Sequence, residues 1–404
     1  MSTVSEAPGT TAMVGDPLRA ARRIAPLLND NAFHGEKRGR LTDQTAAALL
    51  DERLFSLKVK PKWGGYGADY LTTVEVIEEV SRADAASGWC LSVCNSNSAV
   101  ISASLGEDGL AEVFADDARV AIAGALQPRG RSTEVDGGAL FSGEFGWASG
   151  SSHAQWYLAG APVEKPGGAF VIRMHVIPIE ACRLYDNWCV AGLEATCSQD
   201  LSIEDVLVPQ SRIFDVELGA SSLAAGYAGN GGSGAASEST PRGMSIQESA
   251  VLGVAGLAGW ALGVGRRALD ELEEAGPKAK RLLAPGLIAE DFQIQVGLSH
   301  AEGRLRAARA RLMSLLGEMV NSSVGEAPEE LRVSVFEASL ECTVAAREAA
   351  LFAFDSAPTS VVHRHEPIQR CVRDLLVGLK HAAASTAMQS KIGLARFGSP
   401  DHGL

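Results

Sequence analysis

The sequence predicts an α+β fold in which a β domain lies between two helical domains. Apolar residues recur at helical spacing before residue 118, alternate at strand spacing in much of 120–208, and return to long helical patterns after the Gly/Ser-rich stretch at 218–243. We therefore expect an N-terminal helical domain at 17–117, a middle β domain at 118–217 and a C-terminal helical domain at 246–404. Residues 1–16 are expected to form a disordered tail, and 218–245 a linker or loop.

Composition excludes several classes of function. The 404 residues are 46% hydrophobic, which is enough for a large core. Thirty-six Lys and Arg stand against forty-nine Asp and Glu, and no basic run occurs, so we expect neither nucleic acid nor an anionic membrane as a partner. No uninterrupted apolar run reaches about 18 residues, and the N-terminus has no apolar signal core. These features predict a cytoplasmic protein, with its seven scattered cysteines as buried free thiols.

The N-terminal domain should consist of helices at 17–28, 42–54, 72–87 and 89–105, with a Gly-rich loop at 61–67 between the second and third. Four consecutive polar residues, from Asn95 to Ser98, interrupt the otherwise apolar last helix. Polar side chains inside an apolar helix require hydrogen-bond partners. They predict either polar packing between helices or the wall of a pocket, in which Asn95 or Asn97 would hold a substrate.

The most informative stretch is 137–160, which reads GGALFSGEFGWASGSSHAQWYLAG. Its alternation predicts a strand up to Trp147, and a second strand resumes at His153. The pattern indicates a hairpin whose tip carries an indole, the hydroxyl of Ser149 and an imidazole. Small residues at the tip would let backbone N–H groups approach a flat ligand. An ordinary surface hairpin with its tryptophans packed beneath it is the alternative.

The C-terminal domain should form an antiparallel bundle of four helices, at 250–274, 291–320, 328–355 and 367–393. In the last of these, Arg373 and Asp374 precede His381 by about two turns, so Asp374 and His381 are expected to share one face. His363 and His365 lie close to a carboxylate, but their place in a loop favours a solvated turn, and we expect no metal site.

Three motifs resemble the acyl-CoA dehydrogenase superfamily. The Trp-Ala-Ser-Gly-x-x-His-Ala-x-Trp sequence that starts at Trp147 is similar to its flavin-contacting strand pair, in the variant of the oxygen-using branch, the two-component flavin-dependent monooxygenases (group D hydroxylases). Residues 188–208, WCVAGLEATCSQDLSIEDVLV, are similar to the segment that closes the middle domain. The Pro-x-x-Arg-x-x-Arg-Asp-x(6)-His pattern that ends at His381 resembles the last helix of the same branch. The similarity runs from about residue 41 to residue 393.

The resemblance implies an acyl-CoA dehydrogenase-like fold with a middle β-barrel or sandwich, a homotetramer, and a partner flavin reductase. Reduced FAD or FMN and O2 would form a C4a-hydroperoxyflavin that hydroxylates an aromatic, polyketide-like or amine substrate. It implies Ser149 and His381 as catalytic residues, with Ser149 on the flavin N5–O4 edge and His381 as proton donor or acceptor. Asn97, from the polar stretch described above, is the third predicted catalytic residue and would hold the substrate by hydrogen bonds. The residues implied to contact the cofactor are Trp147, Ala148, Ser149, Gln127, Ser198, Arg281, Arg373 and Asp374.

Two other functions stay open on the sequence. Residues 386–396, TAMQSKIGLAR, lack the Tyr-Glu-Gly-Thr segment that carries the glutamate base of many acyl-CoA dehydrogenases, yet a flavin oxidase or desaturase with another base is possible within the family. Many oxygen-using relatives have a histidine in the region of Asn95 to Ser98, and this chain does not. A non-catalytic relative that binds flavin or another ligand is therefore the second alternative.

Overall fold

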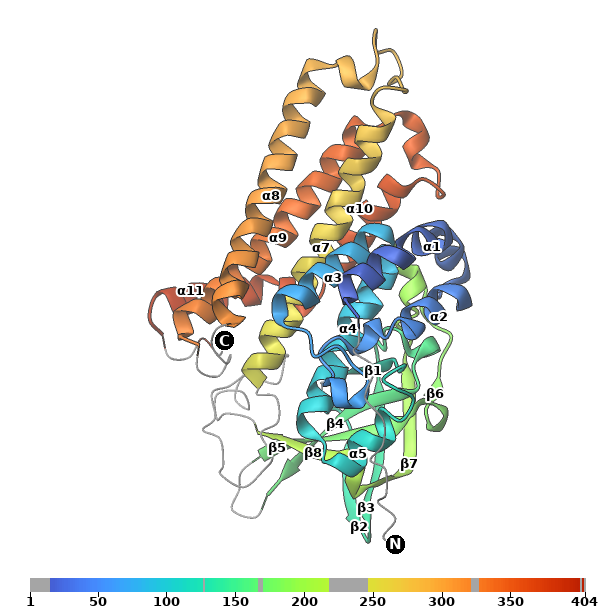
Figure 1. The fold of residues 1–404 in the computed structure, drawn as a ribbon, viewed down its shortest axis with the longest axis vertical. Coiled ribbons are helices and arrows are strands. Elements are labelled where there is room, and N and C mark those ends of the chain that lie inside the picture. Colours follow the sequence, from blue (N-terminus) through green and yellow to red (C-terminus); the bar gives the residue numbers. More distant parts are fainter. Residues whose placement is uncertain are drawn as a thin grey trace, which may run out of the picture.

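The computed structural model describes residues 15–125, 128–165, 170–217, 246–320, 327–399 and 402. Within these residues, helices precede and follow a region of two β-sheets, as the fold class predicted (Figure 1). The predicted tail up to residue 14 and the predicted linker at 218–245 lie outside the described residues. The helices of the N-terminal region are α1 (Pro17–Arg38), α2 (Asp43–Asp51), α3 (Tyr70–Ala83), α4 (Ala85–Ser104) and α5 (Glu107–Val113).

The middle region is a sandwich of two four-stranded sheets. One sheet has the strand order β1-β4-β5-β8 and the other β2-β3-β7-β6. Phe141 and Leu201 from one sheet pack between the layers against Tyr157 from the other. The opposite face of the first sheet packs on α4 and α5. The strands are β1 (Ile122–Ala125), β2 (Arg131–Val135), β3 (Gly138–Phe145), β4 (Trp156–Glu164), β5 (Phe170–Pro178), β6 (Arg183–Leu184), β7 (Leu201–Pro209) and β8 (Ile213–Glu217).

The predicted hairpin at 137–160 is wrong, because its two strands belong to different sheets. β3 pairs with β2 and β7, whereas β4 pairs with β1 and β5. Residues 146–155 instead carry the chain from one sheet to the other through a short 3₁₀ turn at Ser151–His153. This connection is too long for a tight hairpin turn. Each of the two strands pairs instead with other strands of its own sheet. The predicted tip is a crossing between layers, with α4 beside it.

The two helical regions share one hydrophobic core, although the β region separates them in the sequence. Gly259 and Gly263 of α7 lie directly against α3. A methyl group added at Gly259 would lie 2.9 Å from the carbonyl oxygen of Val74, and one added at Gly263 would lie 2.2 Å from that of Glu78. Two helix backbones can approach this closely only where side chains are absent. The C-terminal helices are α7 (Ile246–Ala275), α8 (Phe292–Val320), α9 (Glu329–Ser356), α10 (Pro367–Gly378) and α11 (Thr386–Arg396).

Helix α7 is central to this shared core. Its stretch Glu248–Ala275 is long and apolar enough to cross a bilayer, and among the described helices only this one is. However, 78% of its apolar window is buried inside the protein, as in the core helix of a packed bundle. In Figure 1, α7 runs beside α3 and α9, and so links the N-terminal helices to the long C-terminal helices.

The single last helix predicted at 367–393 is also wrong. α10 ends at Gly378, a 3₁₀ turn follows at Ala382–Ala384, and Ser385 caps a separate helix, α11, through its hydroxyl and the amide of Met388. At the end of α10, Trp260 fills the space where a side chain at position 378 would lie. Asp374 and His381 therefore do not share a helical face.

Helix α4 is continuous through the polar residues that were expected to interrupt it. Asp84 caps its start by accepting from the amide of Ser87 at 2.9 Å. Asn95 donates to the carbonyl oxygens of Leu54 and Leu91 and accepts from the amide of Leu57 at 2.7 Å. Its whole amide is thus used to fix the preceding loop, and it is a structural residue and not a substrate contact.

Replacing Gly378 with alanine should destabilise the fold by about 1–3 kcal/mol, because the new methyl group would lie 2.2 Å from the Trp260 ring and would overpack the core. Gly393→Ala in α11 is the matched control, since no heavy atom lies within 4 Å of its added methyl group. That control should be neutral or stabilising by up to about 1 kcal/mol. Urea unfolding of both variants measures the difference, and equal effects would contradict the packing.

Candidate functional site

Trp89 of α4 brings together two predicted site residues that are far apart in the sequence. Its indole N–H donates to Ser149 Oγ at 3.1 Å. Its ring lies edge-on to the imidazole of His381, with 5.8 Å between centroids and 77° between planes. Trp89 is half-buried and is held from behind by Trp260, whose ring centroid is 4.9 Å away. One tryptophan therefore lies between the candidate hydroxyl and the candidate imidazole.

Ser149 begins a chain of hydrogen-bonded hydroxyls. Its Oγ lies 2.7 Å from that of Ser198, which in turn lies 2.7 Å from Oγ1 of Thr196. Thr196 Oγ1 donates to the carbonyl oxygen of Leu193 at 2.8 Å. The three hydroxyl residues are 1–5% exposed. We call Ser149, Ser198 and Thr196 the hydroxyl chain; it links the 146–155 crossing to residues 185–200, which connect β6 with β7.

The peptide group of Leu193 holds the far end of the hydroxyl chain. Its carbonyl oxygen accepts from Thr196 and also from the indole N–H of Trp188 at 3.1 Å. Its amide donates to Oδ1 of Asp374 at 2.6 Å. Leu193 has φ 55°, in the left-handed region that is costly for a branched side chain. These three bonds hold that conformation and fasten the 185–200 segment to α10.

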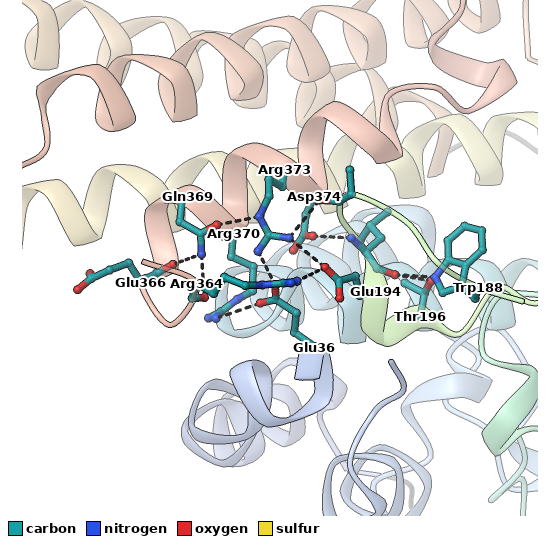
Figure 2. A network of polar contacts seen from close by, with 12 residues as sticks. Glu36, Trp188, Glu194, Thr196, Arg364, Glu366, Gln369, Arg370, Arg373 and Asp374 are labelled. Atoms are coloured by element: carbon teal, nitrogen blue, oxygen red, sulfur yellow. Dashed lines mark hydrogen bonds and ion pairs between the residues drawn. The ribbon is translucent and has the colours of Figure 1, made fainter. Parts of the chain in front are cut away.

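A second network, shown in Figure 2, fastens the same segment to α1 and α10. Glu36 of α1 is 5% exposed and accepts from Arg373 Nη2 at 2.5 Å and from Arg364 at 3.1 Å. Both arginines also contact Glu194. Arg370 Nη1 lies 3.9 Å from the other oxygen of Glu36. We call Glu36, Glu194, Arg364, Arg370 and Arg373 the Glu36 network.

Arg373 and Asp374, two predicted cofactor contacts, are therefore positioning residues in this structure. Besides Glu36, Arg373 contacts Gln369 at 2.7 Å and the carbonyl oxygen of Ala191 at 3.1 Å. Asp374 is 4% exposed and faces Leu193. Both side chains bond to the segment that carries Ser198 and Thr196.

His381 lies in the turn after α10, where its ring caps the following 3₁₀ helix. Its Nδ1 accepts from the amide of Ala383 at 3.2 Å, so the proton of the neutral ring is on Nε2. His381 is exposed at the surface, yet partial burial of its ring lowers the pKa of His381 below its ordinary value. In this tautomer the neutral ring can donate a hydrogen bond from Nε2, which bonds to none of the described residues. Proton uptake at Nε2 needs the other tautomer, without the bond from Ala383.

The exposure and backbone conformation of Trp147 indicate whether the crossing suits a flat ring such as a flavin. Its side chain is 70% exposed, an unusual fraction for a large apolar group, and its φ of 63° is strained for an aromatic residue. Trp188 packs edge-on against it at 5.5 Å and helps to hold it in place. An uncovered indole fixed two residues before Ser149 fits an aromatic ring that binds against it.

The backbone of the crossing does not supply the donors that were predicted. The amides of Ala148, Ser149 and Gly150 donate to the carbonyl oxygens of Gln199, Trp147 and Thr196. Ala148 is also fully buried, which leaves no exposed atom for a cofactor and corrects its prediction as a contact. The side chains of Trp147 and Ser149 are thus the candidate contacts in this segment.

The other predicted site residues lie apart from this group or cannot be placed. Asn97 is 4% exposed and donates to the carbonyl oxygen of Ile122 at 2.9 Å, so it joins α4 to β1. Arg281 forms an ion pair with Asp291 at 2.7 Å on the C-terminal helical region. Gln127 lies outside the described residues.

Sequence reasoning missed Trp89 and Glu36. An indole N–H in an apolar helix needs an acceptor, so Trp89 carried a usable signal. Glu36 lies near the end of α1, where a carboxylate resembles any exposed surface charge, and its three arginine neighbours come from α10 and the loop before it. Only the packing of α1 against α10 reveals that this charge is buried.

Comparison with known proteins settles the family. Two models match: acyl-CoA dehydrogenase, N-terminal domain, at residues 19–112, and acyl-CoA dehydrogenase, C-terminal domain, at residues 255–386. Together they cover more than half of the chain. The chain belongs to the acyl-CoA dehydrogenase family. Its helical N-terminal and C-terminal regions are therefore the two helical domains of this family, on either side of the sheets.

Full-length similarities place the chain in the monooxygenase branch of the acyl-CoA dehydrogenase family, as predicted. It is 27% identical over 383 residues to the oxygenase subunit HsaA, a flavin-dependent monooxygenase of Rhodococcus jostii, covering 93% of this chain and 97% of that protein. A crystal structure of 3-HSA hydroxylase from Rhodococcus sp. RHA1 matches with a TM-score of 0.80 and 25% identity, covering 96% and 98% of the two chains. This chain is also 30% identical to the oxygenase component of an FADH(2)-dependent resorcinol hydroxylase of Rhizobium, over 197 residues that make up 47% of each chain.

Removing the charge of Glu36 should strongly destabilise the protein. In Glu36→Gln, three guanidinium groups lose their shared carboxylate inside the protein, and we expect a loss of about 3–5 kcal/mol in the free energy of unfolding. Asp43→Asn is the control, because that carboxylate is 74% exposed and its contacts with Arg38 and Arg40 are 3.7–3.9 Å long. It should cost no more than about 1 kcal/mol. Similar losses in urea unfolding would show that the Glu36 network is not a buried anchor.

Asp374 should make stability depend on pH. Burial raises the pKa of Asp374 from 3.8 to about 7, so the folded protein holds a proton that the unfolded chain releases at lower pH. This stabilisation is complete below about pH 4 and is lost as the pH rises towards 7. The free energy of unfolding of the wild type, minus that of Asp374→Asn, should therefore fall by about 3–4 kcal/mol between pH 4 and pH 7. Urea unfolding across that range measures it, and a difference that stays constant would contradict the assignment.

Proposed function

We propose that this chain is the oxygenase component of a two-component flavin monooxygenase, with its reaction site beside Trp89, between Ser149 and His381. One observation carries the location: Ser149 and His381, 232 residues apart in the chain, contact the same half-buried indole. The monooxygenase class itself follows from the full-length relatives. The site, the residue roles and the substrate class are the proposal.

Reduced FAD or FMN would be held by the exposed Trp147 indole and the Ser149 hydroxyl, and it supplies the chemistry that activates O2 when bound. Ser149 would orient the ring edge, because its position is fixed by Trp89 and Ser198. Trp89, backed by the fully buried Trp260, would present apolar surface that keeps bulk water away from this edge. These groups position and shield the reactants, and none of them transfers a proton.

His381 would transfer the proton. Its Nε2 bonds to none of the described residues, and its lowered pKa favours the neutral ring. To take up a proton at Nε2, the ring must first carry its own proton on Nδ1, which gives up the hydrogen bond from the Ala383 amide. In that tautomer the neutral imidazole can take the proton of a phenolic hydroxyl or similar acidic group on the substrate and so raise the electron density of the ring that is attacked. Asn97 has no such role here, because an amide does not titrate and this one donates to Ile122. This division replaces the predicted catalytic role of Asn97.

The proposed substrate is a small aromatic compound with an ionisable hydroxyl group. Several relatives are named for aromatic substrates, among them resorcinol, indole-3-acetate and p-hydroxyphenylacetate. Trp89 and Trp147 offer flat apolar surfaces suited to an aromatic ring, and His381 offers a partner for a polar substituent.

A flavin reductase would supply the reduced cofactor, by diffusion or by contact. We also propose a homotetramer in the cytoplasm. Leu282, Leu283, Phe292 and Phe397 of the C-terminal region are 74–96% exposed, which supports contacts between subunits. Arg281 lies next to two of them, where it could reach a flavin phosphate of another subunit. All seven cysteines are free thiols, as a reducing compartment favours.

The test supplies the purified protein with enzymatically reduced flavin, ¹⁸O2 and a panel of phenols. We expect one labelled oxygen atom in a hydroxylated product detected by mass spectrometry. His381→Gln should lower the rate of product formation about 10²–10⁴-fold and leave the affinity for reduced flavin within about twofold. His300→Gln, an exposed histidine on α8, is the control and should behave like wild type.

Two outcomes would decide against the proposal. Unlabelled products together with bleaching of tightly bound flavin by an acyl thioester would assign a dehydrogenase or oxidase activity instead. Full activity in His381→Gln would remove His381 from proton transfer.

A further inference from the structure

The hydrogen atoms of the hydroxyl chain can be placed one by one. The carbonyl oxygen of Leu193 can only accept, so the single hydroxyl hydrogen of Thr196 is used there. Thr196 must then accept from Ser198, and Ser198, whose hydrogen is now used, must accept from Ser149. The Trp89 indole can only donate, so it fills one lone pair of Ser149. Every donor in the chain points away from Trp89 and towards Leu193.

This order leaves Ser149 with one lone pair and no hydrogen for a ligand. A group that meets its Oγ must therefore bring its own N–H or O–H. The flavin ring differs between redox states at the corresponding position, because N5 carries a hydrogen in reduced flavin and presents a bare lone pair in oxidised flavin. Oxidised flavin would set two lone pairs against each other unless the hydroxyls turn round.

We propose that the hydroxyl chain makes Ser149 an obligate acceptor that favours the reduced flavin over the oxidised flavin, with Ser198 and Thr196 as positioning residues for this selectivity. The inference rests on the proposed function, since it takes flavin as the ligand beside Ser149. It explains why an oxygenase that receives reduced flavin from elsewhere would release the oxidised form at the end of its cycle.

The hydrogen bonds of the hydroxyl chain also indicate how large the preference for reduced flavin should be. For Ser149 to donate to oxidised flavin, all three hydroxyls must rotate, and the Thr196 hydroxyl must give up its bond to the Leu193 carbonyl oxygen, which would keep the Trp188 indole and the Thr196 amide as donors. The net contribution of one such hydrogen bond corresponds to roughly a tenfold change in binding. Because the chain is 1–5% exposed, water has little access to replace the lost partner.

Thr196→Val tests the inference, since valine keeps the shape of threonine and removes the hydroxyl that anchors the direction. Ser198 is then free to donate to Ser149, and Ser149 to oxidised flavin. We expect the ratio of the dissociation constants of oxidised and reduced flavin to fall roughly tenfold. Equivalently, the midpoint potential of bound flavin falls by about 30 mV, measured in anaerobic dye-coupled titrations without any substrate.

Two further variants make the result specific. Thr196→Ser keeps the hydroxyl and should retain the wild-type ratio. Ser202→Ala removes another buried hydroxyl of the β domain, which bonds to Tyr185 and not to the hydroxyl chain, and should also leave the ratio unchanged. Unfolding midpoints confirm that each variant is folded.

The possible failures are distinguishable. If the wild type binds neither redox state of FAD or FMN, the proposed function fails, and this inference with it. If Thr196→Val binds flavin with an unchanged ratio and potential, the hydroxyl chain does not select the redox state, while the monooxygenase assignment stands. A shift in Thr196→Ser as large as in Thr196→Val would assign the effect to packing and overturn the inference.

Discussion

The site depends on one peptide group, that of Leu193. Its amide is held by Asp374 of α10, and its carbonyl oxygen ends the hydroxyl chain that positions Ser149. Without an acceptor at that point, Thr196 could turn its hydrogen towards Ser198, and the direction of the whole chain would be undefined. A left-handed backbone at Leu193, costly by itself, is therefore maintained by bonds from α10 and from Trp188.

Holding that peptide requires the two helical regions to act as one body. Glu36 belongs to the first helix of the chain and Arg373 to α10, yet they meet beside Glu194 of the β region. The shared core of α3 and α7, closed by Gly259 and Gly263, brings these ends together. Buried ion pairs add little net stability but are costly to break, so the Glu36 network fixes the orientation of three elements relative to one another. Three separate parts of the sequence thereby converge on one loop.

Much of the fold followed from local patterns, but the site depended on contacts between distant segments. Apolar periodicity located α8 and α9 almost to the residue, and the change to alternation marked the β region. The hairpin prediction failed because alternation identifies a strand without identifying its neighbour, and β3 and β4 pair in different sheets. The prediction of a single last helix failed because Ser385 caps a separate helix, α11, after α10 has ended at Gly378. The motifs singled out Ser149 and His381, which both contact Trp89, but they did not single out that indole.

Helix α4 carries no histidine, and two of its side chains, Asn97 and Trp89, join it to neighbouring elements. Asn97 joins this helix to Ile122 of β1. Trp89, two turns earlier, faces the turn after α10, and that turn carries His381. Because α10 ends early at Gly378, the imidazole stands at a helix end next to the indole and not on the face that Asp374 shares with the buried core. The break in the last helix thus places the imidazole beside the indole that bonds to Ser149, and the proposed proton transfer by His381 depends on this placement.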